Sequence, residues 1–154
     1  MREINKIILH CSDSIFGDRD LIDGWHRSKG FKCVGYHYII LNGRTRYSAV
    51  YDNTIDGILQ IGRDIRDNGA HCVGENSDSI GICLIGIDKF TDKQINRLTL
   101  LISGLRERFG NIPILGHYET KSGAKQSKTC PNIFMPEFRK KHFNEIEMKP
   151  REVK

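Results

Sequence analysis

The sequence contains no long hydrophobic run. Hydrophobic residues make up 38% of its 154 positions, yet no stretch approaches the roughly 18 consecutive apolar residues that a membrane-spanning helix needs. Internal repeats and low-complexity tracts are also missing. We therefore expect no membrane insertion and one globular domain over residues 1–147, followed by a basic tail over residues 148–154.

A signal peptide is not recognisable either. The first six residues, Met-Arg-Glu-Ile-Asn-Lys, are charged and polar where a secretory signal would have its apolar core. The sequence therefore predicts a cytoplasmic protein. If it acts outside the cytoplasm, another protein has to provide the exit.

The cysteines form no disulfide framework. Their number is odd and their spacing is irregular, both of which argue against paired cysteines: Cys11, Cys33, Cys72, Cys83 and Cys130. Most are expected to be small buried apolar side chains. Cys130 is the exception, for reasons given below.

Positive charge is in modest excess. The formal net charge is +5 and the isoelectric point is about 9.0, which suits a polyanionic partner such as nucleic acid, an anionic membrane or an acidic polymer. No helical stripe of lysine and arginine and no nucleic-acid-binding motif is present. We therefore expect no nucleic-acid partner. The alternative to a polyanionic partner is a basic surface that contacts only solvent.

Hydrophobic periodicity predicts an α/β domain with a mixed central sheet flanked by helices. Helices are expected at residues 18–29, 91–109 and 136–147, the second beginning with a capping box of Thr91 and Gln94. Strands are expected at residues 4–10, 34–41, 79–87 and 113–116. The nearly continuous apolar run at 79–87 predicts a central strand covered on both faces.

Three segments are less regular. Asn42-Gly43 predicts a tight hairpin that leads into a strand at residues 45–47. Residues 48–60 fit an extra loop or a short helix. Residues 119–129 are expected to be a polar loop.

Two histidines and one cysteine stand out as candidate metal ligands. His10 and His117 each follow a predicted strand, and Cys130 comes thirteen residues after His117. Ligands collect at strand ends in α/β sheets, and zinc favours this donor set, whose three ligands leave a fourth position open. No short ligand pair is present, so spacing alone is a weak signal, and each histidine taken singly is more often a hydrogen-bonded structural residue.

Five separated segments resemble, in the same order, the phage N-acetylmuramoyl-L-alanine amidases, whose fold is shared by the peptidoglycan-recognition proteins. The resemblance covers roughly residues 6 to 140. The segments are His10-Cys11-Ser12, the Val-Gly-Tyr-His-Tyr-Ile-Ile run of residues 34–40, Gly-Ala-His at 69–71 with Asn76 and Ser-Ile-Gly at 79–81, Gly-His-Tyr-Glu at 116–119, and Lys-Thr-Cys-Pro at 128–131.

This resemblance implies a zinc ion (Zn2+) on His10, His117 and Cys130, and catalytic roles for Tyr36 and Lys128. Lys128 lies two residues from Cys130, so both side chains can face one side of an extended segment, where an ammonium can stabilise an oxyanion. Tyr36 alternates with His37 in its predicted strand. We therefore expect Tyr36 to face the site and His37 to pack behind the sheet.

The resemblance also implies that His71 and Asn76 line a groove for bacterial peptidoglycan. The expected protein is a monomeric endolysin-like amidase that reaches the cell wall through a pore. One alternative is a non-catalytic peptidoglycan-binding module on the same fold, although such relatives typically lack the cysteine ligand that Cys130 provides. Another, a polymerase-regulating protein, is supported by charge alone.

Overall fold

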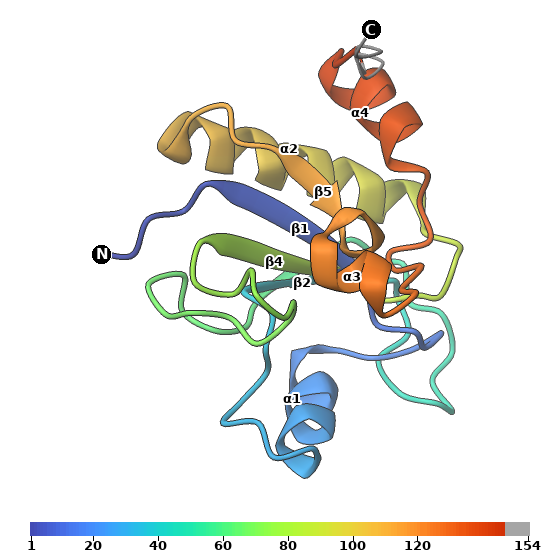
Figure 1. Cartoon of the computed structure of the whole chain (residues 1–154). Coiled ribbons are helices and arrows are strands. Elements are labelled where there is room, and N and C mark those ends of the chain that lie inside the picture. The colour runs from blue at the N-terminus through green and yellow to red at the C-terminus, as the bar shows by residue number, and fades with distance from the viewer. Residues whose placement is uncertain (147–154) are drawn as a thin grey trace, which may run out of the picture.

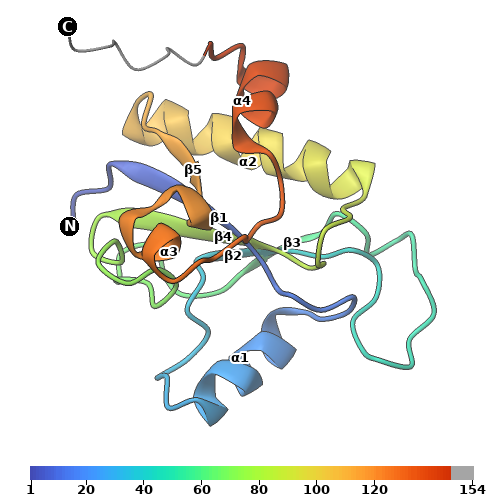
Figure 2. The same ribbon diagram turned by 45° about the vertical axis from the view of Figure 1, so that its right-hand side comes forward.

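The computed structural model describes residues 1–146, in which five strands form one mixed sheet (Figures 1 and 2). The expected tail at 148–154 lies outside the described residues. The strand order is β3-β2-β4-β1-β5, and only β3 runs antiparallel to its neighbour. The strands are β1 (Lys6–Cys11), β2 (Tyr38–Ile40), β3 (Leu59–Ile61), β4 (Ser79–Leu84) and β5 (Ile114–Gly116).

Helices cover both faces of this sheet, which confirms the predicted α/β class. One face carries α2 (Asp92–Phe109) and α4 (Met135–Phe143), and the other carries α1 (Arg19–Ser28) (Figures 1 and 2). A short helical turn η1 (His117–Glu119) and the helix α3 (Lys121–Lys125) follow β5. None of the helices within residues 1–146 is both long and apolar enough to cross a membrane.

Alternation along β1 assigns its side chains to two different environments. Ile7 and Leu9 belong to the core beneath α2 and α4. Residues one position away point to the opposite face of the sheet, so His10 faces the side that carries α1. The α1 side has its own small core, which includes Ile22 of the helix and Ile39 of β2.

Capping residues fix the starts of α1 and α2. Asp18 caps α1, its carboxylate accepting a hydrogen bond from the backbone N–H of Leu21 at 2.9 Å. Thr91 and Gln94 form the predicted capping box at the start of α2. These signals depend on residues within one helical turn, which is why sequence alone identifies them.

The predicted hairpin at Asn42-Gly43 is wrong. Gly43 has a positive φ of 92°, as a turn requires, but the antiparallel partner of β2 is β3, at residues 59–61. The ring of Tyr51 lies against Gly43, where an added Cβ would approach its Cε2 to 2.6 Å. Residues 48–60, for which we expected an extra loop or a short helix, therefore fold back over the turn and lead into β3.

Two further expectations need correction near the C-terminus. Residues 119–129 are not simply a polar loop, because they contain α3, which Thr120 caps through a hydrogen bond from the N–H of Gly123. The last helix ends at Phe143 rather than at residue 147, because Asn144 adopts a left-handed conformation with φ of 55°.

Candidate active site

The register of two parallel strands brings His10 and His117 together. Leu9 of β1 pairs with Gly116 of β5, so the residues that follow them, His10 and His117, emerge side by side at the carboxyl ends of the strands. Their ring centroids lie 4.7 Å apart. The strand pairing alone thus accounts for two of the three candidate ligands.

Cys130 completes the cluster from a distant part of the chain. One ligand atom from each of His10, His117 and Cys130 lies within 4.8 Å of the other two. The cysteine sulfur accepts a hydrogen bond from the backbone N–H of Cys11 at 3.1 Å. In turn, the carbonyl of Cys130 accepts one from the N–H of Tyr118 at 3.1 Å. These bonds hold the cysteine segment against the ends of both strands.

A partly buried ion pair fixes the turn that carries His117. Arg139 of α4 forms two hydrogen bonds with the Glu119 carboxylate, at 2.7 and 2.9 Å. The same carboxylate accepts the N–H of Gly116 at 2.9 Å. A bidentate pair of this kind is geometrically specific, so α4 sets the position of the residues on either side of His117.

Burial keeps the candidate histidine ligands neutral. It lowers the pKa of His10 well below the ordinary histidine value, and it lowers that of His117, with a further contribution from the charge of Lys128. His117 Nε2 is buried and has no hydrogen-bond partner among the described residues. A neutral imidazole with an unshared lone pair is the form that binds a metal.

Tyr36 and Lys128, the expected catalytic residues, both line the cavity that holds this cluster. The Tyr36 ring centroid is 5.0 Å from that of His10, and burial raises the pKa of its phenol well above the usual value. The Lys128 side chain is exposed and lines the same cavity. Tyr36 is therefore a neutral phenol that also interacts with the Cys83 side chain, and Lys128 supplies a solvated positive charge.

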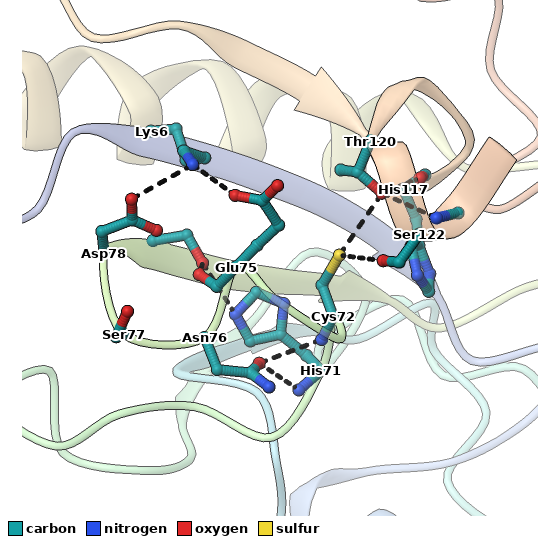
Figure 3. A network of polar contacts seen from close by, with 12 residues as sticks. Lys6, His71, Cys72, Glu75, Asn76, Ser77, Asp78, His117, Thr120 and Ser122 are labelled. Carbon is teal, nitrogen blue, oxygen red and sulfur yellow. Dashed lines mark hydrogen bonds and ion pairs between the residues drawn. The ribbon is translucent and has the colours of Figure 1, made fainter. Parts of the chain in front are cut away.

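The irregular loop before β4 holds the expected substrate-binding residues. His71 Nδ1 is 2.8 Å from His10 Nε2, and His71 Nε2 is 3.3 Å from the hydroxyl of Ser79. Asn76 directs its side-chain oxygen at the backbone N–H groups of His71 and Cys72, at 2.8 and 3.0 Å (Figure 3). Asn76 thus shapes the loop, while both residues also line the cavity.

His37 is fully buried and lies outside the cluster, in keeping with the expectation that it packs away from the site. Its Nδ1 accepts the N–H of Gly81 at 3.0 Å, and its Nε2 is 2.9 Å from the carbonyl of Asp67. Burial lowers its pKa to about 4. His37 therefore joins β4 to the loop that carries His71.

All seven candidate site residues line one cavity of about 700 Å³: His10, Tyr36, His71, Asn76, His117, Lys128 and Cys130. The other residues that line this cavity include Trp25, His26, Lys29 and Phe31, which the sequence did not assign to the site. Trp25 is half-buried against the α1-side core. Helical spacing predicts which face of α1 is apolar but gives no signal that its C-terminal end borders a cavity.

Comparison with known proteins agrees with this geometry. Residues 1–133 match the family described as N-acetylmuramoyl-L-alanine amidase. An endolysin of Klebsiella phage KP32 is 31% identical over 144 residues, covering 86% of this chain and 83% of the phage protein. The endolysin of Escherichia phage T7 is 31% identical over 141 residues, covering 84% and 81% of the two chains.

Solved structures show the same fold at lower identity. The amidase LysC from Clostridium intestinale superimposes with a TM-score of 0.76 at 23% identity, covering 95% of this chain and 88% of its own. A bumblebee peptidoglycan-recognition protein, PGRP-SA, gives a TM-score of 0.71 at 22% identity, covering 97% and 87%.

Proposed function

Because the chain belongs to the N-acetylmuramoyl-L-alanine amidase family, we propose that it is a zinc-dependent endolysin-like hydrolase. The bond it cleaves is the amide between the lactyl group of N-acetylmuramic acid and L-alanine in bacterial peptidoglycan. The observation that carries this proposal is the convergence of His10, His117 and Cys130, with ligand atoms within 4.8 Å of one another.

The donor set suits zinc. Two imidazole nitrogens and one thiolate sulfur are ligands that zinc prefers, and a site with three protein ligands keeps a fourth position for a reactant. The buried, unpartnered Nε2 of His117 supports the assignment, because such an atom is costly unless something binds it. When bound, zinc would supply the Lewis acidity that polarises the scissile carbonyl and acidifies the attacking water.

Tyr36 and Lys128 would then act on the reacting groups. The Tyr36 phenol stays protonated because burial raises its pKa, so it donates a hydrogen bond to the attacking water or to the developing oxyanion. The ammonium of Lys128 stabilises the negative charge on that oxygen. Both side chains line the cavity that holds the ligand cluster.

One chain contains the whole site, which supports action as a monomer. The candidate ligands, Tyr36 and Lys128 all come from the same chain and line the same cavity, which also has room for a sugar–peptide segment. His71 and Asn76 both lie in its wall. The net charge of +5 favours an acidic wall polymer, which a protein made in the cytoplasm would reach through a pore.

Digestion of purified cell wall tests this function. The wild-type protein with zinc should release new N-terminal alanine amines without new reducing sugar ends, and Cys130→Ala should release neither. New reducing ends would instead mean glycosidase chemistry, which uses paired carboxylates. Binding to the wall without release of either product would mean a non-catalytic binding module.

A further inference from the structure

His71 forms one link in a chain of hydrogen bonds that ends at a candidate metal ligand. The Ser79 hydroxyl is 2.6 Å from the carbonyl of Glu75 and 3.3 Å from His71 Nε2. The other ring nitrogen, His71 Nδ1, is 2.8 Å from His10 Nε2. Figure 3 shows His71 within this polar loop, beside Glu75 and Asn76.

The carbonyl of Glu75 sets the direction of every bond in this chain. A carbonyl only accepts, so Ser79 must use its single hydroxyl hydrogen to donate to it. The Ser79 oxygen then accepts from His71 Nε2–H. A neutral imidazole has one N–H and one acceptor nitrogen, so His71 Nδ1 is the acceptor and His10 Nε2 must donate to it. His10 Nδ1 is left with its lone pair.

Two glycines leave room for the His71 ring in this orientation. A Cβ added to Gly69 would lie 2.4 Å from His71 Cδ2, and one added to Gly81 would lie 2.6 Å from the same atom. Real side chains almost never approach so closely, so both positions must remain glycine for the ring to lie where it does.

The backbone of the loop is fixed as well. Asn76 binds the N–H of His71. The thiol of Cys72 lies 3.4 Å from the hydroxyl of Thr120, which in turn donates to the carbonyl of His117 at 2.7 Å (Figure 3). The loop that contacts His10 is thus tied to the turn that carries His117.

From this geometry we propose that His71 is a positioning residue that holds His10 in its Nε2–H tautomer and so presents His10 Nδ1 to zinc. This inference rests on the proposed zinc function. It assigns His71 a different task from a contact with substrate, because both ring nitrogens already have protein partners. In metal sites, the hydrogen bond at one ring nitrogen fixes which nitrogen of the ligand histidine binds the metal.

The tautomer can be measured without metal. In the zinc-free protein at neutral pH, two-bond ¹H–¹⁵N spectra of the histidine rings should show His10 protonated at Nε2 and His71 protonated at Nε2. Ser79→Ala removes the acceptor of His71 Nε2–H, so His71 and His10 should then give averaged tautomer signals. An Nδ1–H signal from His10 in the wild type would overturn the proposal.

Zinc affinity gives a second test. In competition with a chromophoric chelator, His71→Phe should bind zinc about 10- to 100-fold more weakly than the wild type, the range typical of lost outer hydrogen bonds. His71→Asn, whose side-chain oxygen can replace Nδ1 as acceptor, should stay within a few-fold. His142→Phe, on α4 and outside the cavity lining, is the matched control.

These outcomes distinguish a failure of the inference about His71 from a failure of the proposed zinc function. If the wild type binds zinc and cleaves peptidoglycan while His71→Phe keeps full zinc affinity and loses only substrate affinity, His71 is a substrate contact and the inference is wrong. If the wild type binds no zinc, the proposed function itself fails. Thermal unfolding of each variant shows whether it is folded, and His71→Asn and Ser79→Ala keep the test decisive if His71→Phe is not.

Discussion

The backbone N–H of Cys11 donates a hydrogen bond to the sulfur of Cys130 at 3.1 Å, across 119 residues of sequence. Cys11 ends β1, directly after His10, so one strand end both offers a candidate ligand and supports another. The N–H that points at the sulfur favours a thiolate, the form in which cysteine binds metal, whereas the neighbouring Cys11 thiol and burial raise the pKa of Cys130 in the metal-free protein.

This contact leads to a paired prediction about zinc content. Cys130→Ala should reduce the bound metal from about one zinc per chain to nearly none, because only two of the three candidate ligands remain. Cys11→Ala should retain its zinc, because the hydrogen bond comes from the backbone and survives the substitution. Metal analysis after dialysis measures both, and equal retention of zinc in the two variants would refute the ligand assignment.

Lys128 should matter for rate rather than for metal. Lys128→Ala should lower kcat on soluble muropeptide by about 10²- to 10³-fold, the usual effect of losing one group that stabilises an oxyanion, while zinc content stays unchanged. Lys125→Ala is the control, because Lys125 is also exposed, ends α3 and does not line the cavity. Equal rates for the two variants would remove Lys128 from the chemistry.

The sequence predicts most of the sheet because apolar patterns locate strands such as β1 and β4. The candidate metal cluster is predicted by the resemblance to the amidases, since the sequence alone does not show that the strands before His10 and His117 are neighbours. Contacts made by irregular loops are not predictable in this way. The path of residues 48–60 depends on Tyr51 packing over Gly43. The hydrogen bond between His10 and His71 depends on a loop without periodicity.

The segment at residues 48–60 should contribute to stability through one buried carboxylate. Asp56 is 7% exposed and accepts hydrogen bonds from the hydroxyls of Tyr51 and Thr91, each at 2.6 Å. Tyr51→Phe removes one of these bonds and should lower the free energy of unfolding by about 1–2 kcal/mol.

Urea denaturation measures this change. Tyr47→Phe is the control, because Tyr47 lies just before this segment and is 84% exposed. It should change the unfolding free energy by less than about 0.5 kcal/mol. If both substitutions have the same effect, the contact between Tyr51 and Asp56 does not stabilise the loop.

Buried His37 should make the metal-free protein less stable in mild acid. Its pKa is lowered by burial from the ordinary 6.5 to about 4, so between these values the unfolded chain binds a proton that the folded chain does not. The stability from His37 is therefore fully present above about pH 6.5 and is lost as the pH falls towards 4.

Unfolding in urea at pH 7.5 and at pH 4.5, with a chelator present, measures this loss. His10 and His71 also have lowered pKa values, so the wild type alone does not isolate one residue. His37→Asn removes the titrating group and leaves an oxygen that can accept the N–H of Gly81. At pH 7.5 this variant should be less stable than the wild type. Between pH 7.5 and pH 4.5, its free energy of unfolding should fall by about 2–3 kcal/mol less than that of the wild type. An equal loss in both proteins would mean that protonation of His37 does not oppose folding.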